Sequence, residues 1–282
     1  MASTNELPLP VLDALPLGAH RVMALTDDAL FQACGVRIAF FGRDGGVSVG
    51  QFSSLNCSPD VGDSPQAVKR NHGIVCEALG VPDARLFVPC QVHGVDIVQV
   101  GESAGEGALR SQERQTADGL LVAQRGVVAL LNSADCPIVN VVSPTGRFVI
   151  FHAGWRGAVA GIAGKALQAL VQLDAGDPSG YNAYIGPHIR SECFQVQVDV
   201  SRRFLDEFGQ GCVPDDRHVS LAAAITQDLT RNGMDISRIA DAGICTKCNP
   251  DRYYSYRATD GKCGRHGAAA VRIEKPSGDE AS

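Results

Sequence analysis

The chain has 282 residues, of which 45% are hydrophobic and 20% are charged, and its formal net charge is −6 at pH 7. This composition is typical of a globular protein with enough apolar material for a sizeable core. The acidic balance argues against a general nucleic-acid binder, because such proteins gain affinity from basic residues that release counterions from phosphates.

Membrane and export signals are not apparent in the sequence. No apolar run approaches the roughly 20 residues that a membrane-spanning helix needs. The first residues, MASTNELPLPVLDALPLG, lack the basic start and continuous apolar stretch of a signal peptide. We therefore expect a cytoplasmic protein without a membrane partner. Its ten cysteines are then expected to stay reduced, most of them as small buried hydrophobes.

The first hundred residues contain few strong structural signals. Residues 1–34 carry several prolines and little periodicity, which predicts a partly irregular N-terminal extension that includes an edge strand. Val36–Phe41 is predicted to be a strand. Ser64 and Pro65 predict a helix start, and Gly80 predicts its end. The segment 85–100, RLFVPCQVHGVDIVQV, predicts two strands around Pro89–Gly94.

The rest of the chain alternates strand and helix patterns. After a polar surface loop over 101–116, three short apolar runs predict strands buried on both faces: GLLVAQ, GVVALLNS and RFVIFHAG. Helices are predicted over about 158–173, 198–209 and 220–233. Further strands are predicted in YNAYIG, RIADAGIC and YYSYR. We therefore expect one mixed α/β domain over 35–274 and a frayed tail over 275–282.

Three potential metal ligands share one sequence context. His93, Cys136 and His152 each lie at the end of a predicted strand, and a glycine or proline follows within two residues. Strand ends that gather at one edge of a sheet often form sites, and two imidazoles with one thiolate suit catalytic zinc with an open fourth position. Histidine and cysteine at strand ends are more often packed or hydrogen-bonded residues, so spacing alone leaves both interpretations open.

Copper is the alternative metal for two histidines and one cysteine. Blue-copper sites usually add a weak axial methionine, but Met1, Met23 and Met234 are remote in sequence from the three candidate ligands. A multicopper oxidase needs more histidine ligands than seven scattered histidines readily provide. The ligand set therefore favours zinc.

Six motifs occur in the order CQVHG, ADGLLV, NSADCP, HAGWRG, IGPHIRSECFQV and CTKCNPDRYYSYR. Together they resemble the YfiH-type family, also called the laccase-domain, multicopper polyphenol oxidase or purine nucleoside phosphorylase family. The resemblance covers about residues 36–273. Two positions depart from the family pattern: Gly42 precedes Arg43 where threonine is usual, and Ser133 replaces a threonine. Neither position is a candidate ligand.

The resemblance implies a layered α/β/β/α fold with mixed sheets and a zinc ion bound by His93, Cys136 and His152. It implies phosphorolysis of adenosine, inosine, guanosine and methylthioadenosine, together with adenosine deamination. Some bacterial relatives instead correct peptidoglycan precursors. The expected partners are small molecules, a purine nucleoside and phosphate. The laccase label fits the histidine count poorly.

Several polar residues are candidates for roles in phosphorolysis. Arg156 and Arg43 could bind phosphate, although each could equally form a structural salt bridge. Asn56 could orient a sugar hydroxyl or simply stabilise a turn. Asp135 could hydrogen-bond a ligand histidine or act as a base, next to Cys136.

A second group of potential ligands lies near the C-terminus. Cys245, Cys248, Cys263 and His266 form C-x2-C-x14-C-x2-H, which on spacing alone resembles a structural zinc ribbon. The family resemblance implies no second zinc here, and Cys263 falls where many relatives have threonine. We therefore expect only the catalytic zinc.

Three functions remain open on the sequence. The first is a zinc-dependent purine nucleoside phosphorylase with adenosine deaminase activity. The second is a hydrolase that removes a misincorporated amino acid from a peptidoglycan precursor, and the third is a non-catalytic metal-binding protein. Arginines near the zinc suit both a phosphate co-substrate and a phosphorylated precursor, so they do not separate the first two.

Overall fold

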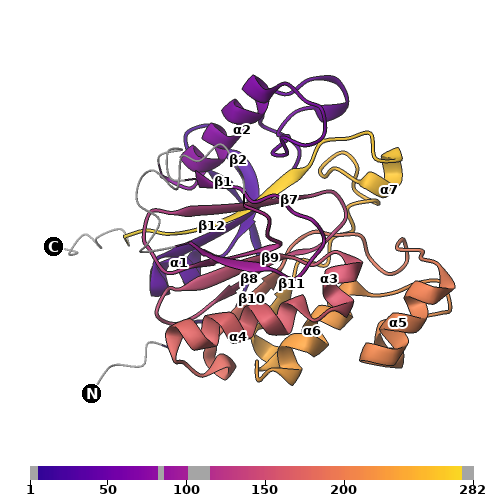
Figure 1. The fold of residues 1–282 in the computed structure, drawn as a ribbon. Helices are drawn as coiled ribbons and strands as arrows, with labels where there is room; N and C mark the ends of the chain where they lie inside the picture. The colour runs from indigo at the N-terminus through magenta and orange to yellow at the C-terminus, as the bar shows by residue number, and fades with distance from the viewer. Residues whose placement is uncertain (1–5, 82–85, 101–114, 275–282) are drawn as a thin grey trace, which may run out of the picture.

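Two mixed six-stranded sheets form the centre of the protein, as seen in a computed structural model that describes residues 6–81, 86–100 and 115–274 (Figure 1). The first sheet has the strand order β1 (Asp13–Leu17), β2 (Val22–Thr26), β3 (Val36–Phe41), β12 (His266–Arg272), β7 (Val128–Ser133) and β4 (Leu86–Phe87). The second has the order β11 (Ile239–Asp241), β10 (Asn182–Ile185), β8 (Ile138–Val142), β9 (Phe148–His152), β6 (Gly119–Val122) and β5 (Ile97–Val100).

The sheets are layered between helices. Alternate residues of β3 and β7 face β8 and β9 across an apolar core between the sheets. On the outer side of the first sheet lies α2 (Pro65–Ala78), and on the outer side of the second lie α4 (Ile162–Asp174) and α6 (Leu221–Arg231) (Figure 1). This arrangement confirms the predicted layered α/β/β/α fold. The remaining α-helices are α1 (Asp28–Cys34), α3 (Trp155–Val159), α5 (Val198–Phe208) and α7 (Tyr256–Thr259).

Local end signals were good predictors of the helices. Ser64 caps α2 by accepting a hydrogen bond from the Ala67 amide at 3.4 Å, and Pro65 occupies the first helical position. Ser220 caps α6 in the same way, and Gly209 follows the last residue of α5.

Four expectations about secondary structure need correction. The helix predicted over 158–173 is interrupted at Gly161, whose φ of 77° separates α3 from α4. YYSYR is not a strand, because Ser255 caps the short helix α7. The strands β8 and β12 were not predicted. The first 34 residues contain the expected edge strand, β1, but also β2 and α1, which were not predicted.

Two other expectations fall largely or wholly outside the part of the chain that the structure describes: the surface loop over 101–116, of which only 115–116 is described, and the tail over 275–282. Within the described ranges, no helix has the length and apolar character needed to cross a membrane.

Several connections carry the chain from one sheet to the other. The segment after β4 enters the second sheet at β5, and the segment after β7 enters it at β8. Residues 242–265 return the chain from β11 to β12 in the first sheet. His93 lies in the first of these crossings and Cys136 in the second. These crossings therefore carry two of the three candidate ligands, whereas His152 lies at the end of strand β9.

Candidate metal centre

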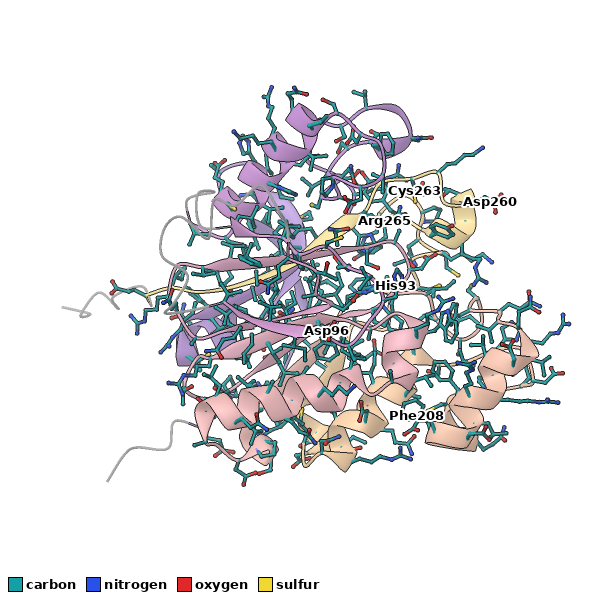
Figure 2. The ribbon with its side chains drawn as sticks, viewed as in Figure 1. His93, Asp96, Phe208, Asp260, Cys263 and Arg265 are labelled. Carbon is teal, nitrogen blue, oxygen red and sulfur yellow. The ribbon has the colours of Figure 1, made fainter. Side chains whose placement is uncertain are left out.

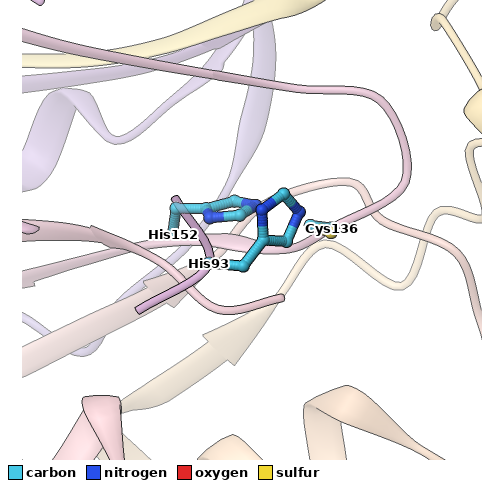
Figure 3. A group of neighbouring side chains, drawn as sticks. All are labelled: His93, Cys136 and His152. Atoms are coloured by element: carbon cyan, nitrogen blue, oxygen red, sulfur yellow. The ribbon is translucent and has the colours of Figure 1, made fainter. Parts of the chain in front are cut away.

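His93, Cys136 and His152 converge in the structure (Figure 3). Their ligand atoms all lie within 4.8 Å of one another. The two imidazole rings meet edge to face, with centroids 4.8 Å apart and an interplanar angle of 85°. His152 is the last residue of β9, whereas the other two residues lie in the crossings between sheets. Three residues that are distant in sequence thus form one potential metal-binding group.

Asp118, which directly precedes β6, organises this group. One carboxylate oxygen accepts hydrogen bonds from the His152 ring Nδ1 at 2.9 Å and the His93 amide at 3.0 Å. The other oxygen accepts from the amides of Val92 and Gly94, at 3.1 and 2.7 Å. His93 has a φ of 61°, so these bonds hold a backbone conformation that histidine rarely adopts. Asp118 therefore fixes both histidines at once and leaves His152 Nε2 free to ligate a metal.

Electrostatics favour an ionised thiol in this group. Burial alone would raise the pKa of Cys136, but the charge and hydrogen bonds of His152, together with His93, lower it below its ordinary value. Burial would likewise lower the pKa of His152, but Cys136 and Asp118 raise it. The pKa of Asp118 is also lowered, because the hydrogen bonds from His152, Gly94 and Val92 outweigh the effect of burial. Metal binding would use the thiolate and displace the imidazolium proton.

Gly154 has no side chain, and this absence leaves room for the side chains of His93, Cys136 and His152 to meet. A Cβ atom at this position would lie 2.6 Å from His93 Cδ2, 3.3 Å from His152 Cε1 and 3.4 Å from Cys136 Sγ. Its φ of −59° and ψ of 160° are open to any residue, so the need for glycine comes from the site and not from the backbone.

Gly154→Ala should therefore weaken the site without unfolding the protein. The added methyl group would push His93 out of position, and we expect metal affinity to fall and kcat/KM to drop about 100-fold. Chelator competition and steady-state kinetics measure the two effects. Gly180→Ala is the matched control, since nothing lies within 4 Å of a Cβ atom there. Full metal affinity in the Gly154 variant would contradict the assignment.

The donor set fits zinc better than copper. Two imidazoles and one thiolate leave a fourth tetrahedral position open, as in catalytic zinc sites. Of the described methionines, neither Met23 nor Met234 lines the cavity that contains the three candidate ligands, so the axial methionine that blue-copper sites usually have is missing from it.

A cavity of about 440 Å³ opens over this group, a volume that suits a small organic ligand. Aromatic and apolar walls come from Trp155, Phe194, Tyr256 and Ile189. Arginines and other polar side chains also line it: Arg156, Arg257, Arg265, Gln91, Asn132, Asp60 and Asp135. The residues 242–265 carry Arg265 above His93 in the view of Figure 2.

The structure brings two of the predicted substrate-site residues into the cavity. Arg156 is exposed at its edge and stacks over the Trp155 ring at 4.4 Å from the centroid. Asp135 is buried, and its carboxylate accepts hydrogen bonds from Thr246 Oγ1 and the Arg257 amide, both at 2.7 Å. The expected hydrogen bond to a ligand histidine is thus made by Asp118 instead, and Asp135 ties the cysteine loop to the 242–265 crossing.

Arg43 and Asn56 are not among the cavity-lining residues. Arg43 donates to the carbonyls of Ser53 and Pro250 and lies over the Tyr254 ring. Asn56 is fully buried and accepts a hydrogen bond from the Arg265 amide at 2.9 Å. Both side chains therefore stabilise loops behind the cavity wall.

Sequence reasoning missed Asp118, Arg257 and Arg265 as site residues. Asp118 and Arg257 lie within motifs that supported the family resemblance, ADGLLV and YYSYR, yet neither was given a role. An aspartate directly before a fully buried strand was the available signal for Asp118, because a buried carboxylate requires several donors.

The C-terminal pattern C-x2-C-x14-C-x2-H is not assembled as its spacing suggested. Cys245 and Cys248 converge with Cys193, and their sulfur atoms all lie within 4.8 Å of one another. Cys263 is buried near Tyr254, and the His266 ring stacks on the same tyrosine. Burial lowers the pKa of His266 to about 3, which keeps this ring neutral in the core.

Comparison with known proteins places these features in context. The family described as multi-copper polyphenol oxidoreductase laccase matches residues 37–273. Purine nucleoside phosphorylase from Xylella fastidiosa strain 9a5c is 33% identical over 238 residues, which cover 80% of this chain and 87% of the relative. Purine nucleoside phosphorylase YlmD from Geobacillus stearothermophilus is 34% identical over 246 residues, 83% of this chain and 89% of the relative.

Solved structures agree with this match. The crystal structure of the hypothetical protein YfiH from Bacillus licheniformis superposes with a TM-score of 0.81 at 26% identity, and covers 89% of this chain and 96% of that one. YlmD from Geobacillus stearothermophilus superposes with a TM-score of 0.79 at 29% identity, and covers 95% of this chain and all of its own.

Proposed function

This chain belongs to the multi-copper polyphenol oxidoreductase laccase family, the YfiH-type proteins, and from that membership we propose that it is a zinc-dependent purine nucleoside phosphorylase. The observation that carries the proposal is an open group of two histidines and one cysteine within a cavity that has aromatic walls and arginines. Relatives named purine nucleoside phosphorylase support the substrate class. Adenosine, inosine, guanosine and methylthioadenosine are the proposed substrates.

The reaction requires groups that bind phosphate and groups that hold the purine, near one another. A phosphate oxygen attacks C1′ of the ribose, the bond from C1′ to the purine nitrogen breaks, and the purine takes up a proton and leaves as the free base. Arg156 and Arg257 offer guanidinium groups for the phosphate. Trp155, Phe194 and Tyr256 offer ring faces for the purine.

The protein residues would position the reacting groups around the metal. When bound by His93, Cys136 and His152, zinc would supply Lewis-acid chemistry, by polarising a substrate oxygen or lowering the pKa of a water molecule. Asp118 would keep both histidines oriented. The same site could support adenosine deamination, in which water adds at C6 of the purine and ammonia leaves.

A nucleoside panel incubated with and without inorganic phosphate, with products identified by mass, tests this proposal. We expect free purine base and ribose 1-phosphate to form only with phosphate, and inosine to form from adenosine without it. Release of an amino acid from a peptidoglycan precursor, independent of phosphate, would favour the editing hydrolase instead. Inertness toward every substrate with zinc bound would favour a non-catalytic metal-binding protein.

Arg156→Ala should weaken phosphate use specifically. A hydrogen bond to a charged group contributes about 1.5–3 kcal/mol, so the KM for phosphate should rise about 10- to 100-fold while the KM for nucleoside changes little. Phosphate titrations at saturating nucleoside measure this effect. Arg202→Ala, at an exposed position of α5, is the matched control. An unchanged KM for phosphate would remove Arg156 from the anion site.

A further inference from the structure

Three cysteines converge outside the first centre. Cys193 lies in the loop after β10, and Cys245 and Cys248 lie in the 242–265 crossing. All three sulfur atoms lie within 4.8 Å of one another, and the Sγ atoms of Cys193 and Cys248 are 3.4 Å apart. The histidine and cysteine ligands of the first centre are not part of this group.

Core packing explains only part of this convergence. Cys245 is buried and Cys193 half-buried, and both pack in one apolar cluster, but Cys248 is exposed and lies outside it. A cysteine that served only as a small hydrophobe would gain nothing by meeting two other thiols at the surface. A disulfide requires about 2.05 Å between sulfurs. Two thiolates on one tetrahedral zinc, each about 2.3 Å from the metal, lie about 3.8 Å apart. The 3.4 Å separation is closer to the second geometry.

The surroundings of Cys245 also suit a metal ligand. Hydrogen bonds hold the backbone around it: the Thr246 amide donates to the His188 carbonyl at 3.1 Å, and Asn249 Nδ2 donates to the Cys245 carbonyl at 2.8 Å. A cation could replace thiol protons here, because the three sulfurs already lie within 4.8 Å of one another.

We propose that Cys193, Cys245 and Cys248 bind a second metal ion, a thiophilic cation such as zinc, through three thiolates with a fourth position open. The site would join two loops that both line the cavity. One loop contributes Ile189 and Phe194, and the 242–265 crossing contributes Tyr256 and Arg257. The two loops already meet through Asp135, which accepts from the Ile189 amide and from Thr246 Oγ1. The second metal would brace the cavity walls and take no part in bond breaking.

Metal counting tests the site directly, without any substrate. Protein from zinc-supplemented medium, kept reduced, should hold about two zinc ions per chain, and Cys248→Ser should hold about one. Cys136→Ala should also hold about one, because it removes the other ion. With cobalt in place of zinc, Cys136→Ala should show thiolate-to-cobalt charge-transfer absorption, and the double variant with Cys248→Ser should lose it.

Two further cysteines provide controls. Cys263→Ser should keep both ions, which separates the observed cluster from the sequence spacing pattern, and Cys34→Ser in α1 should do the same.

Cys248→Ser should lower the Tm by about 5–10 °C and raise the KM for nucleoside more than it lowers kcat. Unchanged metal content in Cys248→Ser would overturn the proposal. A disulfide between Cys193 and Cys248 as the resting state of the protein, with no zinc bound there, would also overturn it. Neither result depends on which reaction the enzyme performs.

Discussion

Cys136→Ala is expected to lose the metal ion of the first centre and to lower kcat/KM at least about 1,000-fold. The substitution removes the only thiolate among the three ligands and leaves two imidazoles, which hold zinc much more weakly. A Lewis acid stabilises a transition state by several kcal/mol, and about 4 kcal/mol corresponds to about a thousandfold in rate. Elemental analysis and adenosine phosphorolysis measure the two losses on the same preparation.

The fold should survive this substitution, because alanine removes a single sulfur atom from a residue that is only half-buried. Cys34→Ala, at another half-buried cysteine, is the matched control and should keep both metal and activity. If Cys136→Ala retained its full metal content, the three-ligand group would not be the metal centre. If the metal were lost but activity kept, the metal would be structural.

Asp118→Asn is expected to weaken metal binding about 10- to 100-fold and to destabilise the protein. Each carboxylate oxygen accepts two N–H donors, so whichever way the amide turns, its NH2 group faces two other donors. A buried donor left unsatisfied costs about 1–3 kcal/mol, which for two donors corresponds to a Tm lower by about 5–10 °C. Chelator competition and thermal unfolding measure these effects.

Asp206→Asn provides the control for this change, because Asp206 is exposed on α5 and should affect neither quantity. Removal of the metal with a chelator separates the two consequences. The Asp118 variant should remain less stable than the original chain even without metal, since its lost hydrogen bonds do not involve the ion. Equal stability of the two apo proteins would show that Asp118 acts only through the metal.

Features set by neighbouring residues were predictable from the sequence. The Ser64–Pro65 start of α2 and the Gly209 end of α5 depend on backbone groups within one turn. Strand β12 was missed for the opposite reason: HGAAAVR is rich in alanine and glycine, which favour strands poorly. It is a strand because β3 and β7 lie on either side of it.

The site shows the same division between local and distant information. The strand ends before His93, Cys136 and His152 indicated a possible meeting point, but not that the chain changes sheets there. Asp118 contacts residues about 25 and 34 positions away, and no local pattern encodes those hydrogen bonds. The C-terminal cysteines had ligand-like spacing, yet their partner in space is Cys193, 52 positions before Cys245.

The sheet crossings have a consequence for how such an enzyme can diversify. The candidate metal ligands lie where the connections leave the strands, held by buried partners such as Asp118. Phe194, in the loop after β10, and Tyr256, the first residue of α7, line the same cavity from segments that carry none of these candidate ligands. Mutation can therefore alter the surface that meets the substrate while the catalytic chemistry is inherited unchanged. Proteins with this fold can therefore change substrate in evolution while the candidate metal-binding residues stay the same.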